Sequence, residues 1–166
     1  MNRVIVLVPF ILVFLHLNVD AQIPTSRAEG LKMLRGCATR PTTLNCNEDT
    51  AGYLIKLYNR GDRGLLRPLL EAGLTSDGAL SEVLGDFYSE VLAKRPRSFL
   101  SSLRLRSQGQ QTHFCWMAGL ADGGGLNAAT LRRVRSSLRA FSSSNDGLAP
   151  IARVCLMEVD RANSGR

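Results

Sequence analysis

Large apolar residues recur at helical spacing along most of the chain, and this periodicity limits its possible folds more than any other feature. The clearest stripe lies in segment 78–94 and consists of Leu80, Val83, Leu84, Phe87 and Val91. Residues three and four apart share one face of a helix, so this stripe predicts an amphipathic helix. Alternating apolar runs rich in β-branched residues are absent after residue 21, and strands therefore have little support. The sequence predicts an all-α fold.

Start and stop residues divide the chain into about six or seven helices. Gly61 and Gly73 end two early helices, Pro96 opens a later one, Asn127 caps another and Pro150 opens the last. Glycine tolerates the positive φ of a helix C-terminus, proline fits a first turn, and asparagine accepts hydrogen bonds from free amides. We expect the helices to form a compact bundle or a short right-handed array of helix pairs.

Two segments, roughly 48–73 and 78–106, share a loose pattern of long helix, short turn, proline and leucine-rich helix. The stretches LYNRGDRGLLRPLL and FYSEVLAKRPRSFL show it best. This pattern resembles the helix-pair units of HEAT-like solenoids, and also small secreted all-helical bacterial proteins of unknown role. The resemblance covers less than half of the chain. It implies stacked helix pairs, and an orthogonal bundle remains the alternative.

The first 21 residues have the form of a cleaved secretory signal. A cation at Arg3 precedes an apolar stretch from Val4 to Leu17, and small residues lead to a cleavage site after Ala21. The apolar stretch is shorter than the roughly 20 residues that span a bilayer. We therefore expect residues 22–166 to form a single helical domain in the periplasm or medium of a bacterium, without an integral membrane segment.

The chain contains four cysteines, Cys37, Cys46, Cys115 and Cys155. An even number in an exported protein predicts two disulfides, because the oxidising compartment lets them persist. A metal site would more often show a C-x-x-C pair or neighbouring histidines, and neither is present. Four cysteines allow three pairings, of which we favour Cys37 with Cys46 and Cys115 with Cys155.

Charge is distributed unevenly in this basic chain, whose formal net charge is +7. Residues 68–93 contain five acids and no base, whereas residues 94–139 have a net charge of +8. Arg132, Arg135 and Arg139 share one flank of a predicted helix and form a possible anion-binding patch. Such a patch could bind an anionic protein or glycan, and export argues against nucleic acid. A solvated surface whose arginine stems cover apolar neighbours is the favoured interpretation.

The tripeptide Arg60-Gly61-Asp62 matches the signal that animal adhesion receptors recognise. A turn between two helices explains the same residues, because Gly61 suits a helix end and Asp62 suits an N-cap. We favour the turn and expect the Asp62 side chain to cap the following helix.

Carboxylates give the only enzymatic hypothesis. Glu82, Asp86 and Glu90 form one acidic stripe at i, i+4 and i+8. A glycan hydrolase needs two carboxyl groups across a cleft, so Glu71 or Asp77 would have to oppose this stripe. A solvated helix face is the favoured interpretation.

Other chemistry has little support. His113 is the only histidine after residue 21, which excludes paired-histidine sites, and we expect it to be a half-buried packing residue. Residues 121–127 are glycine-rich but lack the Lys and Ser or Thr of a phosphate-binding loop. The sequence thus indicates no metal and no cofactor. It favours a binding or structural domain of unknown ligand, with a cell-wall glycan hydrolase as the alternative.

Overall fold

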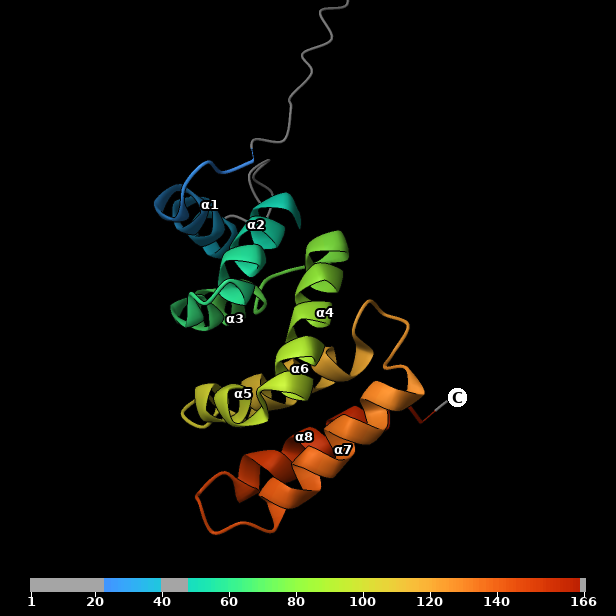
Figure 1. Ribbon diagram of the computed structural model, residues 1–166. Coiled ribbons are helices and arrows are strands. Elements are labelled where there is room, and N and C mark those ends of the chain that lie inside the picture. The colour runs from blue at the N-terminus through green and yellow to red at the C-terminus, as the bar shows by residue number, and fades with distance from the viewer. Residues whose placement is uncertain (1–22, 40–47, 165–166) are drawn as a thin grey trace, which may run out of the picture.

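The computed structural model describes residues 23–39 and 48–164, most of which lie in eight α-helices and one 3-10 helix, η1 (Figure 1). The helices are α1 (Arg27–Thr39), α2 (Glu48–Asn59), η1 (Arg63–Leu65), α3 (Leu66–Ala72), α4 (Gly78–Lys94), α5 (Pro96–Leu103), α6 (Gln108–Leu120), α7 (Ala128–Ser142) and α8 (Ala149–Ala162). No strand occurs in these two ranges, which confirms the all-α prediction for the described part of the chain. The expected number of six or seven helices was too low.

The helix that the sequence did not reveal is α1. Two glycines, Gly30 and Gly36, lie within it, and each weakens helix propensity by up to about 1 kcal/mol relative to alanine. Gly30 instead allows α1 to approach α2, because a Cβ atom there would lie 3.0 Å from the side chain of Leu54. Leu34 of α1 is also buried, and α1 contacts both α2 and α3. Tertiary packing therefore stabilises a helix that local preference does not favour.

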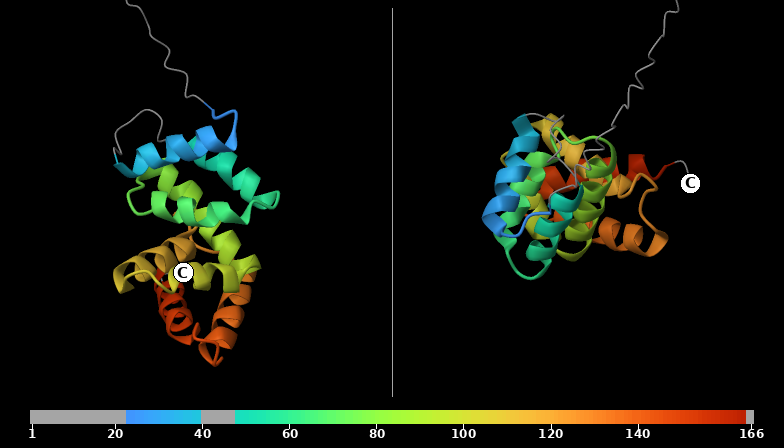
Figure 2. Two further views of the ribbon diagram at one scale, coloured as in Figure 1. Left: turned by 90° about the vertical axis from the view of Figure 1, so that its left-hand side faces the viewer. Right: turned by 90° about the horizontal axis from the view of Figure 1, so that it is seen from above.

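The helices stack into an elongated body, with α1 to α3 at one end and α7 and α8 at the other (Figure 2, left). Helix α4 joins the two ends, since it contacts α2 as well as α5, α6 and α7. The expected helix pairs correspond to α2 with α3 and α4 with α5. Helix α6 packs between α4 and α8.

Aromatic side chains from four helices form the centre of the core. The ring of Phe87 lies 5.0 Å from that of Tyr58 in an edge-on arrangement, and the ring of Tyr88 lies 5.6 Å from that of Phe114. The Tyr88 hydroxyl donates a 2.7 Å hydrogen bond to the carbonyl of Leu69. Burial raises the pKa of Tyr88, so the hydroxyl stays protonated and the bond ties α4 to α3.

Two glycines allow α6 to approach its neighbours closely. A Cβ atom on Gly85 of α4 would lie 2.3 Å from the carbonyl oxygen of Ala121, directly after α6. A Cβ atom on Gly119 would lie 2.9 Å from the Cβ atom of Ala162 and 3.0 Å from the Cα atom of Val159. Any larger side chain at either position would force the helices apart.

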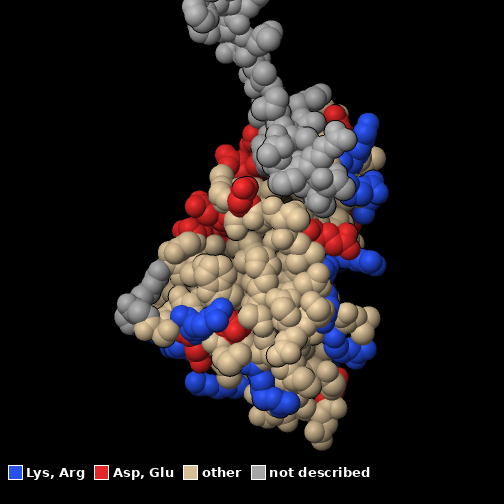
Figure 3. Space-filling model, turned by 180° about the vertical axis from the view of Figure 1, so that it is seen from behind, with Lys and Arg blue, Asp and Glu red and all other residues tan. Residues whose placement is uncertain are grey.

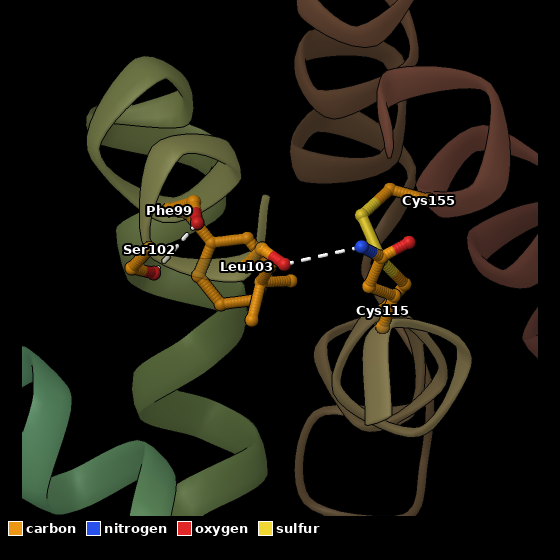
Figure 4. The surroundings of a disulfide bond; sticks show 6 residues. Phe99, Ser102, Leu103, Cys115 and Cys155 are labelled. Atoms are coloured by element: carbon orange, nitrogen blue, oxygen red, sulfur yellow. Dashed lines mark hydrogen bonds between the residues drawn. A yellow bond between two sulfur atoms is a disulfide. The ribbon is translucent and has the colours of Figure 1, made fainter. Parts of the chain in front are cut away.

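Covalent and polar contacts also fix α6 against α8. The disulfide between Cys115 and Cys155 joins them with a Cα–Cα distance of 4.7 Å, beside Phe99, Ser102 and Leu103 of α5 (Figure 4). This bridge confirms one of the two predicted disulfides. The expected bridge between Cys37 and Cys46 lies outside the described residues.

The side chain of Asn163 joins three segments near the end of α8. Its Nδ2 group donates to the carbonyls of Gly119 and Val159 at 3.0 and 2.8 Å. Its Oδ1 atom accepts a hydrogen bond of 3.0 Å from the amide of Leu126. This buried side chain thereby satisfies backbone groups that would otherwise lack partners.

Most of the predicted helix ends are confirmed, with one error. Gly61 has φ of 124°, Asn127 accepts a 2.9 Å hydrogen bond from the amide of Thr130, and Pro96 and Pro150 lie in first turns. The side chain of Asp62 forms no capping hydrogen bond. It is directed instead to Arg27 of α1, so the predicted cap was wrong.

Candidate functional site

An open cleft of about 500 Å³ lies between α3 and the junction of α5 with α6. Its walls combine two arginines, one glutamate, several hydroxyl and amide groups and one leucine. These residues are Arg67, Glu71, Ser101, Ser102, Leu105, Arg106, Ser107 and Gln110. Such a mixture of cations and hydrogen-bonding groups suits a polar, negatively charged ligand.

Local structure determines the positions of the cleft's cations. Arg67 lies one turn before Glu71 on α3, and its Nε atom is 3.0 Å from the Glu71 carboxylate. Arg106 follows α5, and its guanidinium lies 5.3 Å from the centre of the Phe114 ring. Cation–π contact holds this guanidinium beside the cleft while its N–H groups remain available to a ligand.

The turn between α5 and α6 is held by hydrogen bonds from both sides. Ser107 caps α6 by accepting a 3.4 Å hydrogen bond from the amide of Gln110. The Nε2 group of Gln111 donates to the carbonyls of Leu103 and Arg106 at 3.2 and 3.0 Å. The backbone that carries Arg106 and Ser107 is therefore fixed before any ligand binds.

Leu105 projects from this turn into solvent with 89 % of its surface exposed. A large apolar side chain at the rim of a polar cleft can contact the apolar faces of a ligand. The cleft thus offers both charge and one apolar contact.

The predicted arginine patch lies on α7, away from this cleft. Arg135 is engaged with α8, because its Nε atom is 2.6 Å from the carboxylate of Asp160. Arg132 and Arg139 are exposed and form no ion pair with another described residue. The structure therefore leaves two of the three guanidinium groups free for an anion.

The predicted carboxylates do not come together in the cleft or in two smaller cavities that described residues line. Glu71 lines the large cleft and a small cavity against α1, whereas Glu82 lines a separate groove between α4 and α6. Asp77, Asp86 and Glu90 line none of them. The hydrolase hypothesis consequently has no opposed pair of carboxylates in these cavities.

Asp86 of α4 lies among other acidic side chains. Partial burial raises the pKa of its carboxyl group, and the negative charges of Asp122, Glu82 and Glu90 raise it further. Glu90 is paired with Lys94 at 2.7 Å, and no described cation forms an ion pair with the other three.

His113 is half-buried on α6, as expected for a packing residue. Its Nε2 atom lies 2.9 Å from the carbonyl oxygen of Gly73, and its ring contacts Phe114. The imidazole donates its proton to that carbonyl, which ties α6 to the end of α3. Within the described ranges, no three His, Cys, Asp or Glu side chains are placed to hold a metal ion.

No described helix is both long and apolar enough to cross a membrane. The described part of the chain is thus all-helical, is linked by a disulfide and carries an open polar cleft. Comparison with protein-family models, with curated proteins and with solved structures finds no match.

Sequence reasoning did not identify the cleft, because α3 is distant in the chain from the junction of α5 with α6 that forms its other wall. Arg67 and Arg106 are two of many arginines, and neither belongs to a recognisable motif. The one local signal was Ser107, a favoured N-cap residue followed by an uncharged helix.

Proposed function

We propose that the protein is an exported helical binding module that holds an anionic glycan segment in the cleft between α3, α5 and α6. The observation that carries this proposal is the position of Arg106, which forms no ion pair with another described residue, among hydroxyl and amide groups in one open cavity of about 500 Å³. Arg67 lies in the same cavity and is paired with Glu71. Guanidinium groups bind carboxylate and sulfate oxygens through paired hydrogen bonds.

The rest of the cleft matches the other parts of such a ligand. Ser101, Ser102 and Gln110 can exchange hydrogen bonds with sugar hydroxyl groups. Leu105 can contact the apolar face of a sugar ring. The positive N-terminal end of α6, which has no acidic residue in its first turn, adds favourable potential for an anion.

Export is supported by the secretory form of residues 1–21 and by the disulfide between Cys115 and Cys155. Disulfides persist in oxidising compartments, where extracellular and cell-wall glycans also occur. The size and openness of the cleft favour a segment of a longer chain over an enclosed small molecule.

Calorimetric titration with a sulfated tetrasaccharide tests the proposal. Replacing Arg106 by Gln removes the cation but keeps a similar length, and it should weaken binding by roughly tenfold or more, as expected for a lost charge-assisted hydrogen bond. Arg133→Gln is the matched control, because Arg133 is an exposed arginine on α7 that carries the same charge. Equal weakening in both variants would mean that net charge alone attracts the ligand, and the proposal would fail.

A further inference from the structure

A second cavity lies at the other end of α6. It is a groove of about 130 Å³ between α4 and the C-terminal turn of α6. Trp116, Met117, Leu120 and Ala121 form its apolar wall, and Gly85 of α4 lies opposite. The carbonyl of Ala121 lies where a side chain at Gly85 would be, so α4 and the end of α6 meet closely at this groove.

Trp116 is the feature that points to an interaction. It is the single tryptophan of the chain, and 37 % of its surface is exposed beside the half-buried Leu120. Tryptophan is enriched where proteins bury anchor residues of a partner, because one large rigid ring supplies much apolar area. The groove is therefore suited to take an apolar side chain from outside.

The charge around the groove selects the kind of partner. Glu82 lines the groove itself, and Asp86 and Asp122 lie close enough to one another to interact electrostatically. No ion pair between described residues involves any of these three carboxylates. The C-terminal end of α6 adds partial negative charge at the same place.

Figure 3 shows this polarity on one face of the molecule. Acidic side chains gather along its upper left, most basic ones occupy its right edge and lower part, and a wide area without charge lies between them. Helix α6 contributes no Asp, Glu, Lys or Arg side chain to the surface. The side of this uncharged surface that borders the acids is complementary to a segment that is both apolar and basic.

We infer that the groove between α4 and α6 docks a basic amphipathic segment of a partner protein. An apolar side chain of this segment packs against Trp116 and Leu120, and its Lys or Arg side chains pair with Glu82, Asp86 and Asp122. The chain as a whole is positively charged at +7, so a basic segment is repelled at long range. Binding therefore depends on the local carboxylates and on the apolar contact together.

Emission from Trp116 tests this inference directly, because the chain contains no other tryptophan. The probe is a tryptophan-free peptide whose lysines and leucines recur at helical spacing. Two comparison peptides replace every lysine by glutamate or every leucine by serine. We expect a saturable change in emission with the first peptide alone, and we expect about 0.5 M salt to weaken it.

Variants distinguish binding in the groove from a general attraction between the basic peptide and any acidic surface. Glu82→Gln with Asp122→Asn should weaken binding by roughly tenfold, because two rim charges lose their partners. The control is Glu48→Gln with Asp49→Asn, which removes two exposed acids from the first turn of α2 and should leave binding unchanged. Circular dichroism checks that both variants remain folded.

Three results would overturn the inference. The first is an emission that does not respond to the lysine–leucine peptide, and the second is equal weakening in the two double variants. The third is a change in Trp116 emission when the protein is concentrated without any peptide, if the double variant Glu82→Gln with Asp122→Asn does not show this change. A second copy of the chain would then occupy the groove.

Discussion

The carboxylate of Asp62 lies 2.5 Å from the guanidinium of Arg27, and this ion pair joins the turn after α2 to the first turn of α1. The side chain of Asp62 is thereby directed to a residue 35 positions earlier in the chain. The Arg60-Gly61-Asp62 tripeptide thus forms a turn whose aspartate has a structural partner, with Gly61 at a φ of 124°.

Replacing Asp62 by Asn or by Ala should therefore have similar effects. Each change removes the ion pair, and each should lower the free energy of unfolding by no more than about 1 kcal/mol, because both partners are partly exposed. Urea denaturation of Asp62→Asn, Arg27→Gln and the double variant measures the coupling between the two side chains. A loss of about 1 kcal/mol in Asp62→Ala together with no loss in Asp62→Asn would point to a helix cap instead.

Gly85→Ala should destabilise the protein by roughly 1–3 kcal/mol. The new methyl group would meet the carbonyl oxygen of Ala121, and the backbone cannot move aside without separating α4 from α6. Gly52→Ala is the matched control, since a Cβ atom there has no neighbour within 4 Å in the interior of α2. The control should gain up to about 1 kcal/mol from helix propensity. Thermal or urea unfolding of both variants measures the difference, and a neutral Gly85→Ala would contradict the close crossing.

Removal of the bridge between Cys115 and Cys155 should also lower stability. A disulfide that spans 40 residues typically contributes about 2–4 kcal/mol, largely by restricting the unfolded chain. Urea unfolding of the double variant Cys115→Ala with Cys155→Ala measures this loss. Peptide mapping without reductant provides the check on connectivity, and a fragment that links Cys115 to any other cysteine would disprove the pairing.

Asp86→Asn should stabilise the protein at neutral pH. The pKa of the Asp86 carboxyl is raised by burial and by neighbouring acids, so its ionised form is disfavoured in the folded state. The neutral side chain removes that repulsion, which should add less than about 1 kcal/mol because the group is largely exposed. As the pH falls through the raised pKa toward the ordinary value of about 3.9, the wild type becomes protonated and the advantage should disappear. Denaturation at several pH values tests this trend, and an advantage that grows at acidic pH would contradict it.

The sequence was sufficient for the fold class and for most helices, because their apolar stripes and end residues agree. The stripe from Leu80 to Val91 became α4, and Asn127 caps α7 as expected. The sequence did not predict α1. This helix packs through Gly30 against Leu54 of α2, and its local helix propensity is low.

The residues of the candidate site could not be predicted from the sequence. Arg67 and Arg106 are separated in the chain by two helices, α4 and α5, and meet only because α3 lies beside the junction of α5 with α6. Arg135 was assigned to a possible anion-binding patch, and the structure pairs it with Asp160 of α8. Periodicity shows which side chains share a helix face, whereas contacts between helices determine which of them remain free.

Binding at the cleft is the central claim, and backbone amide NMR during titration with a sulfated tetrasaccharide tests it most directly. We predict that the amide signals of Ser101, Ser102, Ser107 and Gln110 shift progressively and saturate, while those of α7 remain in place. Shifts confined to Arg132, Arg133, Arg135 and Arg139 would place the anion on the α7 surface and would contradict the cleft.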